Sequence, residues 1–550
     1  MSHLPVGDSQ VGEVNDLATL AKLDETILLN EVKVRYENDR IYTYVGDILV
    51  SVNPFRDLGI YGKDYSEMYR GVKKREEKPP HIFAMADRLY QDMLGLRGTD
   101  AKNQCVLISG ESGAGKTECT KLIIKQLIDL CQGNSQLQQQ ILQVNPLLEA
   151  FGNAQTLMND NSSRFGKYIQ LKFIGGREYL LEKSRMVRQS EGEANFHIFY
   201  YMFAGLSADE QSRYKLQDAD SYKYFSDGAS CIQTDGKLLK ERYEELVNAI
   251  DMVGFTDKEQ EDMFAILAAT LTVGNIDVKA DDIGVADLLG LDKLEMHSCL
   301  SCSITFTKGE EIRRNYTLAQ SEEARDAVAK ALYGRLFSWI VNRVNTLLVP
   351  RESFDPDKVQ EIGILDIFGF EHFELNSFEQ ACINLANEQL QFFFNKHIFM
   401  LEQEEYQGEG IDWKEIKFVD NKSLLDLFLG RPIGILALLD EESFFPKATD
   451  QTYVAKMNQK FGKNSNYIRS TQGDAKSFTI AHYAGHVTCD SMELCQVTYD
   501  STGWLEKNRD TLPPGKISRT GTLALNHKTT KKSRLNQPRK AAEETKQRKL

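Results

Sequence analysis

The clearest chemistry in this sequence is carried by a short glycine-rich run. Residues 110–117 read G-E-S-G-A-G-K-T, which fits the phosphate-binding pattern G-x-x-x-x-G-K-[ST]. Glycines let backbone N–H groups turn toward an anion, Lys116 is able to reach nucleotide β- and γ-phosphates, and Thr117 is able to ligate Mg²⁺. A plain turn is the alternative, which the Lys-Thr ending disfavours. The run predicts a nucleotide site formed by Gly110, Glu111, Ser112, Gly113, Ala114, Gly115, Lys116 and Thr117.

The segments on both sides of this run have the character that the chemistry needs. Gln104 to Ser109 is a short apolar stretch, typical of a buried parallel strand. From Thr117 to Leu130, apolar residues recur at helical spacing. A strand, a glycine loop and a helix in this order direct a helix N-terminus at phosphate, where its field stabilises the anion.

Two further polar segments could complete a phosphate site. Residues 159–167 read N-D-N-S-S-R-F-G-K, too rich in donors for a core element, and Ser162 and Ser163 could supply a second Mg²⁺ ligand and hold the attacking water. Residues 362–365 form an apolar strand that ends in D-I-F-G-F-E, where Asp366 could orient Mg²⁺ and its waters. The bland alternatives are a solvated loop and an acidic cap on an ordinary strand.

A proline-fixed turn is a weaker candidate for base binding. Asn53, Pro54, Phe55 and Arg56, with Tyr61 soon after, could hold a purine ring. Taken alone, this pattern favours a structural turn.

The composition is that of a globular chain with several subdomains. It has 550 residues, 41% hydrophobic and 27% charged, and its net charge of −14 argues against general nucleic-acid binding. Nine scattered cysteines and the absence of a signal peptide fit a reducing cytosol. The sequence contains no run of about 18 apolar residues, so no membrane-spanning helix is predicted. Residues 515–550 are basic, with 11 Lys/Arg against 2 Glu.

Other segments have helix or strand patterns, and two possible metal motifs can be dismissed. Helices are expected over 17–36, from His81 through Tyr90, and over 141–151 with Pro146 at a start or kink; hairpins are expected over 42–52 and 168–186.

Cys299 and Cys302 lack a second pair at zinc spacing, so free thiols are favoured. His482 and His486 lack an intervening Glu and lie in a strand-like segment.

Several long motifs, in order, carry a family resemblance. They are N-P-F at 53–55, the glycine run at 110–117, L-L-E-A-F-G-N-A at 147–154, N-S-S-R-F-G-K at 161–167, N-F-H-I-F-Y at 195–200, D-I-F-G-F-E at 366–371, G-I-L-A-L-L-D-E at 434–441, H-Y-A-G at 482–485 and G-W-L-E-K-N-R-D at 503–510. From Leu17 to Thr511 the chain resembles a myosin motor domain. The resemblance implies an α/β phosphate-loop NTPase fold with a central mixed twisted sheet flanked by helices. The short leader favours a class III-like unconventional myosin.

The resemblance also implies site roles, with ATP and Mg²⁺ as cofactors. In the family, a switch arginine and a switch glutamate form an ion pair that closes the site behind the γ-phosphate, and the matching residues are Arg164 and Glu371. The implied catalytic residues are Lys116, Ser162, Arg164, Gly369 and Glu371; the nucleotide would also contact Asn53 to Arg56, Tyr61, the glycine run, Asn159, Ser162 and Ser163; and the metal would contact Thr117 and Ser163, with Asp366 acting through waters.

The same resemblance implies actin filaments as the partner, and the cytoplasm and actin cytoskeleton as the location. The actin-binding segments would be residues 430–450, with Phe444-Phe445-Pro446 at an exposed tip or in a buried turn, and the loop near Glu310 or Glu311. Residues 377–401 resemble the relay helix, and Trp413 lies in the matching loop or on a plain surface loop. Nucleic-acid and membrane partners are not expected, and no light-chain-binding motif is recognisable.

The sequence departs from the family pattern most strongly after Pro513. Ala194, Thr272 and Val273 are small departures. We expect a disordered leader over 1–15, a motor domain truncated before the converter over 16–513, and a basic disordered tail over 514–550. The third strand of the family's sheet, the converter and the lever are not recognisable. We therefore expect a weakened sheet and a chain that does not move actin alone.

Three functions remain open at this point. The favoured one is an actin-based, motor-type Mg-ATPase. The second is a non-motile nucleotide- or actin-binding remnant with little turnover. The third, an unrelated phosphate-loop kinase or GTPase, is poor because no guanine-specificity motif accompanies the motif series. The complete switch residues favour the first function, and the absent strand favours the second.

Overall fold

The computed structural model describes residues 11–97, 100–131, 135–156, 159–172, 176–225, 235–277, 284–307, 310–348, 360–374, 376–411, 416–418, 420–443, 449–469 and 476–490. The chain divides into two units. The first comprises Met1–Leu142, Thr156–Glu182 and Val349–Asp500, and the second comprises Gln143–Gln155, Lys183–Leu348 and Ser501–Leu550. The predicted 514–550 tail, Trp413 and Phe444–Pro446 lie outside the described residues, as do the side chains of Glu310 and Glu311.

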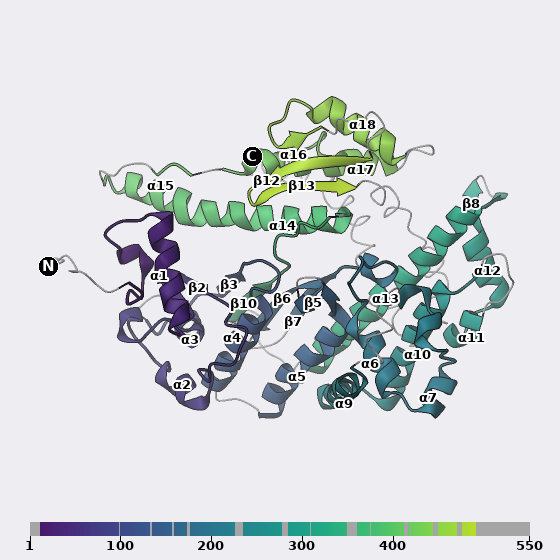
Figure 1. Cartoon of the computed structure of the whole chain (residues 1–550), viewed down its shortest axis with the longest axis horizontal. Helices are drawn as coiled ribbons and strands as arrows, with labels where there is room; N and C mark the ends of the chain where they lie inside the picture. Colours follow the sequence, from purple (N-terminus) through teal and green to yellow (C-terminus); the bar gives the residue numbers. More distant parts are fainter. Residues whose placement is uncertain are drawn as a thin grey trace, which may run out of the picture. The chain divides into compact units, whose positions relative to one another are not determined.

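A four-stranded mixed sheet lies at the centre of the first unit (Figure 1), in the order β3-β10-β6-β7. Strand β3 (Gln104–Ile108) is parallel to β10 (Glu361–Asp366), and β10 is antiparallel to β6 (Phe165–Lys172). Strand β7 (Gly176–Leu181) pairs antiparallel with β6. The mixed α/β class is confirmed, and so are the predicted strands around residues 104–109 and 362–365.

Helices α3 (Ile82–Met93) and α4 (Lys116–Leu130) pack against this sheet. The apolar positions Ile123, Ile124 and Leu127 of α4 are buried in one core with Ile362 and Ile364 of β10. Two adjacent apolar positions followed by a third one turn later form a single face of a helix. This packing fixes the start of α4 close to the ends of β3 and β10, where the predicted phosphate site lies.

The predicted hairpin at residues 42–52 is present, but it forms a sheet of its own. Strands β1 (Tyr42–Val45) and β2 (Ile48–Ser51) pair antiparallel around a turn at Gly46, whose φ is +58°. Among the described residues, β3 pairs with β10 alone, so its other edge carries no strand. An edge strand has a ladder partner on one side only.

The N-terminal segment differs from expectation in two respects. Helix α1 covers only Glu25–Glu37, and a short 3₁₀ helix, η1 (Leu17–Thr19), precedes it. Residues 11–15, which we predicted to be part of a disordered leader, lie against α1. The buried Arg35 donates to the carbonyls of Gly12 and Val14 at 3.2 and 2.8 Å. A buried guanidinium needs several acceptors, and the leader backbone supplies two of them.

The polar run at residues 159–167 is not the solvated loop that we considered as an alternative. Residues Asn159–Ser163 form strand β5, and the run continues into β6. Ser162, Arg164 and Lys167 are each less than 5% exposed. The charges of Arg164 and Lys167 are compensated by partners from other elements, which composition alone does not reveal.

The remainder of the first unit is built around a long helix. Helix α14 (Phe378–Asn395) continues through a π-helical turn at Lys396–Met400 into α15 (Leu401–Gly408), as expected for residues 377–401. One apolar core joins this helix to α16–α18 and to the sheet β11-β12-β13. The bounds are α2 Lys63–Met68, η2 Arg75–Glu77, α16 Lys422–Leu429, α17 Ile435–Ser443, α18 Asp450–Phe461, β11 Tyr467–Ile468, β12 Ser477–His482 and β13 Gly485–Asp490.

The second unit is mainly helical. Its long helix α13 (Leu318–Leu348) buries Tyr333, which stacks on Phe196 and donates to the carbonyl of Phe151 at 2.6 Å. The chain passes from the first unit into the second within α5 (Ser135–Gly152), which contains Pro146. The other elements are β4 Asn153–Thr156, η3 Ser184–Met186, α6 His197–Gly205, α7 Ala208–Arg213, η4 Ala219–Ser221, η5 Lys223–Phe225, α9 Gly236–Val253, α10 Asp257–Gly274, α11 Gly284–Leu289, α12 Lys293–Ser301, β8 Cys302–Thr307 and β9 Glu310–Asn315.

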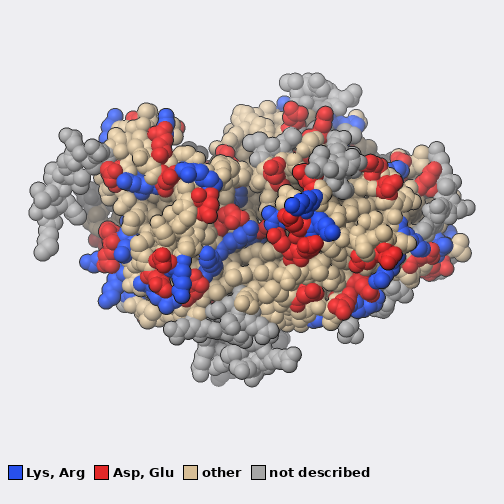
Figure 2. Space-filling model, turned by 60° about the horizontal axis from the view of Figure 1, so that its bottom comes forward, with Lys and Arg blue, Asp and Glu red and all other residues tan. Residues whose placement is uncertain are grey.

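Both dismissed motifs, the Cys299/Cys302 pair and the His482/His486 pair, lie within the described part of the chain. Cys299 and Cys302 are free thiols, and no group of three or more His, Cys, Asp or Glu side chains is placed to hold a metal there. None of the described helices is both long and apolar enough to cross a bilayer. Charges of both signs interleave on the face that Figure 2 shows.

Candidate functional site

The phosphate-loop candidate lies between the end of β3 and the start of α4. Gly115 is the N-cap of α4 and has φ +92°, a left-handed backbone conformation that residues other than glycine rarely adopt. The Nζ atom of Lys116 donates to the carbonyls of Gly110 and Glu111 at 2.9 and 2.7 Å. Burial lowers the pKa of Lys116, while the charges of Asp366, Glu371 and Glu111 oppose that shift. The loop thus holds a cation beside a helix N-terminus, the arrangement that binds phosphate.

Two hydroxyls from different elements meet beside this loop. The Oγ1 atom of Thr117 on α4 lies 3.2 Å from the Oγ atom of Ser163 on β5. Mg²⁺ takes oxygen ligands and retains several waters, so two neighbouring hydroxyls next to a phosphate site fit this metal. The structure therefore brings together the two residues that we expected to contact it.

The third metal candidate, Asp366, is held by a lysine that the sequence analysis did not identify. Its Oδ2 atom lies 3.0 Å from Nζ of Lys167, and each side chain is at most 5% exposed. The two residues are direct partners in the antiparallel pairing of β10 and β6. The parallel pairing of β10 with β3 places Asp366 opposite Ile108, just before the glycine loop. Lys167 is thus able to fix the orientation of the Asp366 carboxylate.

The candidate base-binding turn reaches the phosphate loop through one residue. The Nδ2 atom of Asn53 donates to the carbonyl of Gly113 at 2.8 Å, and its Oδ1 atom accepts from the backbone of Phe55 at 3.0 Å. The Phe55 side chain is 83% exposed. Arg56 pairs with Asp39 rather than with the loop. The remaining candidate, Tyr61, hydrogen-bonds through its hydroxyl to Tyr42 at 2.8 Å.

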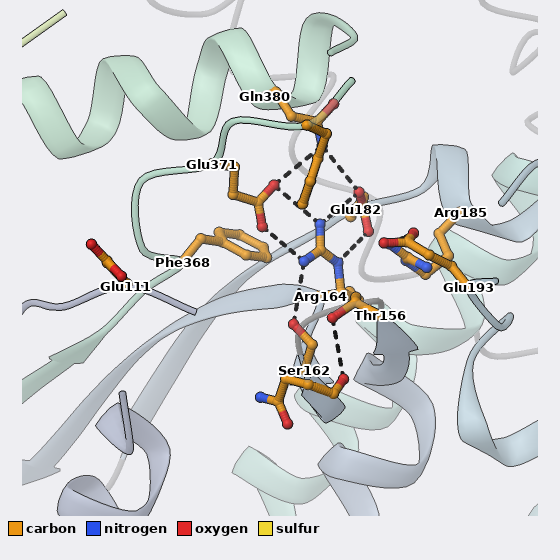
Figure 3. Close-up of polar contacts among 12 residues, drawn as sticks. Glu111, Thr156, Ser162, Arg164, Glu182, Arg185, Glu193, Phe368, Glu371 and Gln380 are labelled. Carbon is orange, nitrogen blue, oxygen red and sulfur yellow. Dashed lines mark hydrogen bonds and ion pairs between the residues drawn. The ribbon is translucent and has the colours of Figure 1, made fainter. Parts of the chain in front are cut away.

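The two switch candidates form a buried bidentate ion pair (Figure 3). Arg164 Nη1 lies 2.8 Å from Glu371 Oε1, and Nη2 lies 3.2 Å from Oε2. Nη1 also donates to the Ser162 hydroxyl at 3.3 Å. The Oδ1 atom of Asn384 on α14 accepts from the backbone N–H of Glu371 at 2.9 Å, and its Nδ2 atom donates to the Glu371 carbonyl at 2.8 Å. The glutamate is therefore fixed at its main chain as well.

A second glutamate, which the sequence analysis missed, also binds this arginine. Glu182 accepts from Arg164 Nε at 2.6 Å and from Nη2 at 2.9 Å. Burial by itself lowers the pKa of Arg164, but the charges of Glu182 and Glu371 outweigh burial and hold that pKa well above its usual value. The available signal was an acidic residue at the end of an apolar strand, the same signal that identified Asp366.

Gly369 lies so close to the phosphate loop that a side chain would displace it. A Cβ atom built at Gly369 would come closer than 3.0 Å to the carbonyl oxygen of Gly110. We expect Gly369→Ala to lower nucleotide turnover by about a hundredfold, because displacements of about 1 Å at a reacting centre have effects of this size. Gly408→Ala is the matched control, since nothing lies within 4 Å of its added Cβ. Equal steady-state turnover of the two variants would contradict the prediction.

Comparison with known proteins agrees with this geometry. Residues 14–547 match the family described as Myosin head (motor domain). The chain is 45% identical over 529 residues to Myosin-IIIb of Mus musculus, covering 91% of this chain and 39% of that protein. It is 46% identical over 536 residues to Myosin-IIIa of Homo sapiens (92% and 32%), and 44% identical over 530 residues to Myosin-VIIa of Drosophila melanogaster (92% and 24%).

The chain spans less than two fifths of the length of each of these relatives. The identities to the class III and class VII relatives differ by at most two percentage points, so the class III-like assignment stays a prediction. The family match covers the whole range over which the motifs occur and confirms the resemblance. The chain belongs to the myosin head (motor domain) family.

Proposed function

We propose that this chain is an actin-dependent Mg-ATPase. The observation that carries the proposal is the bidentate pair of Arg164 and Glu371, formed in the unit that also holds the phosphate loop and the neighbouring hydroxyls of Thr117 and Ser163. Mg²⁺, when bound, would neutralise charge on the phosphate oxygens. An ion pair that closes over the γ-phosphate excludes bulk water and holds one water in line for attack.

In this proposal, no side chain acts as a covalent nucleophile. Lys116 stabilises the charge of the phosphates, Thr117 and Ser163 bind the metal, and Asp366 orients the metal's waters. Ser162 holds the attacking water, and Gly369 presents its backbone N–H to the γ-phosphate. Asn53 links the base-binding turn to the loop, and Asn159, Pro54, Phe55, Arg56 and Tyr61 border the nucleotide.

Actin filaments are the proposed partner, and the actin cytoskeleton of the cytoplasm is the proposed location. Family membership supports both. The contacting segments would be residues 430–450 and the hairpin β8–β9, which contains Glu310 and Glu311. That this chain alone does not move filaments stays a prediction, which sustained filament gliding over the purified chain would contradict.

A binding remnant with little turnover is the second candidate. The free edge of β3 favours it, because β3 leads into the phosphate loop and, within the described ranges, has a ladder partner on one side only. A weakly held strand would leave the loop less well positioned.

Steady-state MgATP hydrolysis by the purified chain, with F-actin titrated in, separates the two candidates. Turnover that rises with actin supports the ATPase, and GTP in place of ATP tests nucleotide choice. A folded protein that binds nucleotide without turning it over would favour the remnant. Lys116→Ala serves as the inactive reference throughout.

The metal assignment has its own test. We expect Ser163→Ala to raise the Mg²⁺ concentration for half-maximal turnover by about tenfold or more, because one oxygen beside the metal is lost. Ser221→Ala is the control, since this serine lies in a short 3₁₀ helix of the second unit. Removal of Mg²⁺ by EDTA should stop turnover in every variant. If Ser163→Ala left the Mg²⁺ concentration for half-maximal turnover unchanged, Ser163 would not be a ligand of the metal.

A further inference from the structure

The guanidinium of Arg164 is shared between two carboxylates from different elements. Glu182 follows β7 directly, and its backbone N–H donates to the carbonyl of Arg164 at 2.8 Å while its carboxylate accepts two side-chain bonds. Glu371 lies in the segment after β10 and binds the other edge of the guanidinium. The Glu182 contact belongs to the β6–β7 hairpin itself. It is therefore independent of where the segment after β10 lies.

A carboxamide bridges these two carboxylates. The Nε2 atom of Gln380 lies 3.2 Å from Glu371 Oε2 and 3.4 Å from Glu182 Oε1. Its Oε1 atom accepts from the backbone and the hydroxyl of Ser377 at 2.9 and 2.6 Å, which completes a capping box at the start of α14. The cap thus fixes which end of the amide faces the carboxylates (Figure 3).

This buried group brings three charged side chains into contact. One guanidinium faces two carboxylates, and Arg164, Glu182, Glu371 and Gln380 are each at most 7% exposed. Buried charges need both a counter-charge and hydrogen-bond donors. Gln380 supplies a neutral donor, whereas a carboxylate there would be a third negative group around one cation. Glu379, the acidic residue in the first turn of α14, accepts from the Ser377 hydroxyl.

We infer that Glu182 and Gln380 are positioning residues for closure: Glu182 keeps the guanidinium of Arg164 oriented toward Glu371, and the carboxamide of Gln380 lets both carboxylates share that cation. This inference rests on the proposed ATPase. Glu182 and Gln380 do not contact the nucleotide in this scheme. They determine how readily the Arg164–Glu371 pair forms.

The test uses Gln380→Glu, which keeps the capping box but replaces the donor by an acceptor. At pH 8 we expect its MgATP turnover to be about tenfold or more below that of the unmodified chain. Two neighbouring carboxylates raise the pKa of the introduced carboxyl, so protonation toward pH 6 should restore a donor and recover much of the loss, relative to the unmodified chain at each pH.

The double variant Glu182→Gln/Gln380→Glu restores one carboxamide and two carboxylates around Arg164. We expect its turnover at pH 8 to exceed that of Gln380→Glu. The matched control is Glu210→Gln, the reverse exchange in the Ser207 capping box of α7, which should leave turnover unchanged at every pH. A Gln380→Glu profile parallel to that of the unmodified chain, or a double variant no better than the product of the single effects, would overturn the inference.

Denaturant unfolding of the unmodified chain, the two single variants Glu182→Gln and Gln380→Glu, and the double variant keeps the inference testable if the unmodified chain shows no turnover. That result would reject the ATPase proposal, but not the pairing of residues 182 and 380. The double variant should then unfold at a higher denaturant concentration than the two single shifts predict together. Shifts that simply add would overturn the inference, whatever the activity.

Discussion

Replacing Arg164 by methionine is expected to lower MgATP turnover strongly and to lower the free energy of unfolding by about 3–5 kcal/mol. The substitution removes the guanidinium that both buried carboxylates, Glu182 and Glu371, bind. We expect turnover to fall about a thousandfold, the lower range found when an arginine that stabilises transferring phosphate is lost. Quenched-flow hydrolysis assays and urea unfolding would measure the two effects.

The stability of this variant should depend on pH through these two carboxylates. Loss of the shared guanidinium raises the folded-state pKa of a buried carboxylate above its unfolded value, so the folded variant binds more protons than the unfolded chain. Its stability should therefore rise as pH falls through that folded-state pKa. Adding Glu182→Gln to Arg164→Met removes one of these two carboxylates. It should recover part of the stability at pH 8, but none of the turnover.

An exposed ion pair supplies the control for this prediction. Arg213 lies 3.1 Å from Glu261, and both side chains are about half exposed (60% and 47%). Surface pairs contribute about 0–1 kcal/mol, so Arg213→Met should change neither the unfolding free energy by more than that nor the turnover. If Arg164→Met behaved like Arg213→Met in both assays, the buried pair would have neither a structural nor a functional role.

Local sequence patterns predict the part of this site that consecutive residues build. The strand before Gly110, the glycine run and the helix from Lys116 follow from apolar runs and helical spacing. The parallel strand before Asp366 follows from its short apolar stretch. These features need no knowledge of the remainder of the chain, because glycine conformations and helix N-termini are local properties.

The remainder of the site depends on contacts between distant segments, which periodicity cannot reveal. Arg164 and Glu371 are 207 residues apart, and only the family resemblance implied their pairing. Lys167 and Gln380 were missed because a charged or amide residue in a polar segment usually indicates a solvated surface. Glu182 follows an apolar strand, but nothing in that strand reveals its arginine partner 18 residues earlier. Here each is buried with partners from another element. The same reason explains why residues 159–167 were expected to be a loop.

Lys116→Ala is expected to reduce MgATP turnover by about 10²- to 10³-fold or more, with a small effect on folding. Loss of one donor that stabilises developing charge at a reacting centre typically has an effect of this size. Among the described residues, Lys116 donates to the carbonyls of Gly110 and Glu111 in the loop. Two such bonds contribute about 1–3 kcal/mol in total to stability, and those carbonyls can turn to water when the lysine is absent.

The matched control is Lys121→Ala, one turn further along α4, where the ammonium pairs with Glu118 on the helix surface at 2.8 Å. Steady-state hydrolysis, nucleotide binding and urea unfolding of both variants would distinguish the possible causes of a loss. Folded Lys116→Ala protein without turnover, beside fully active Lys121→Ala, assigns the effect to phosphate stabilisation. Equal turnover of both variants would mean that the glycine run is not where hydrolysis occurs, because a reaction dominated by charge stabilisation cannot be indifferent to the loss of its one loop cation.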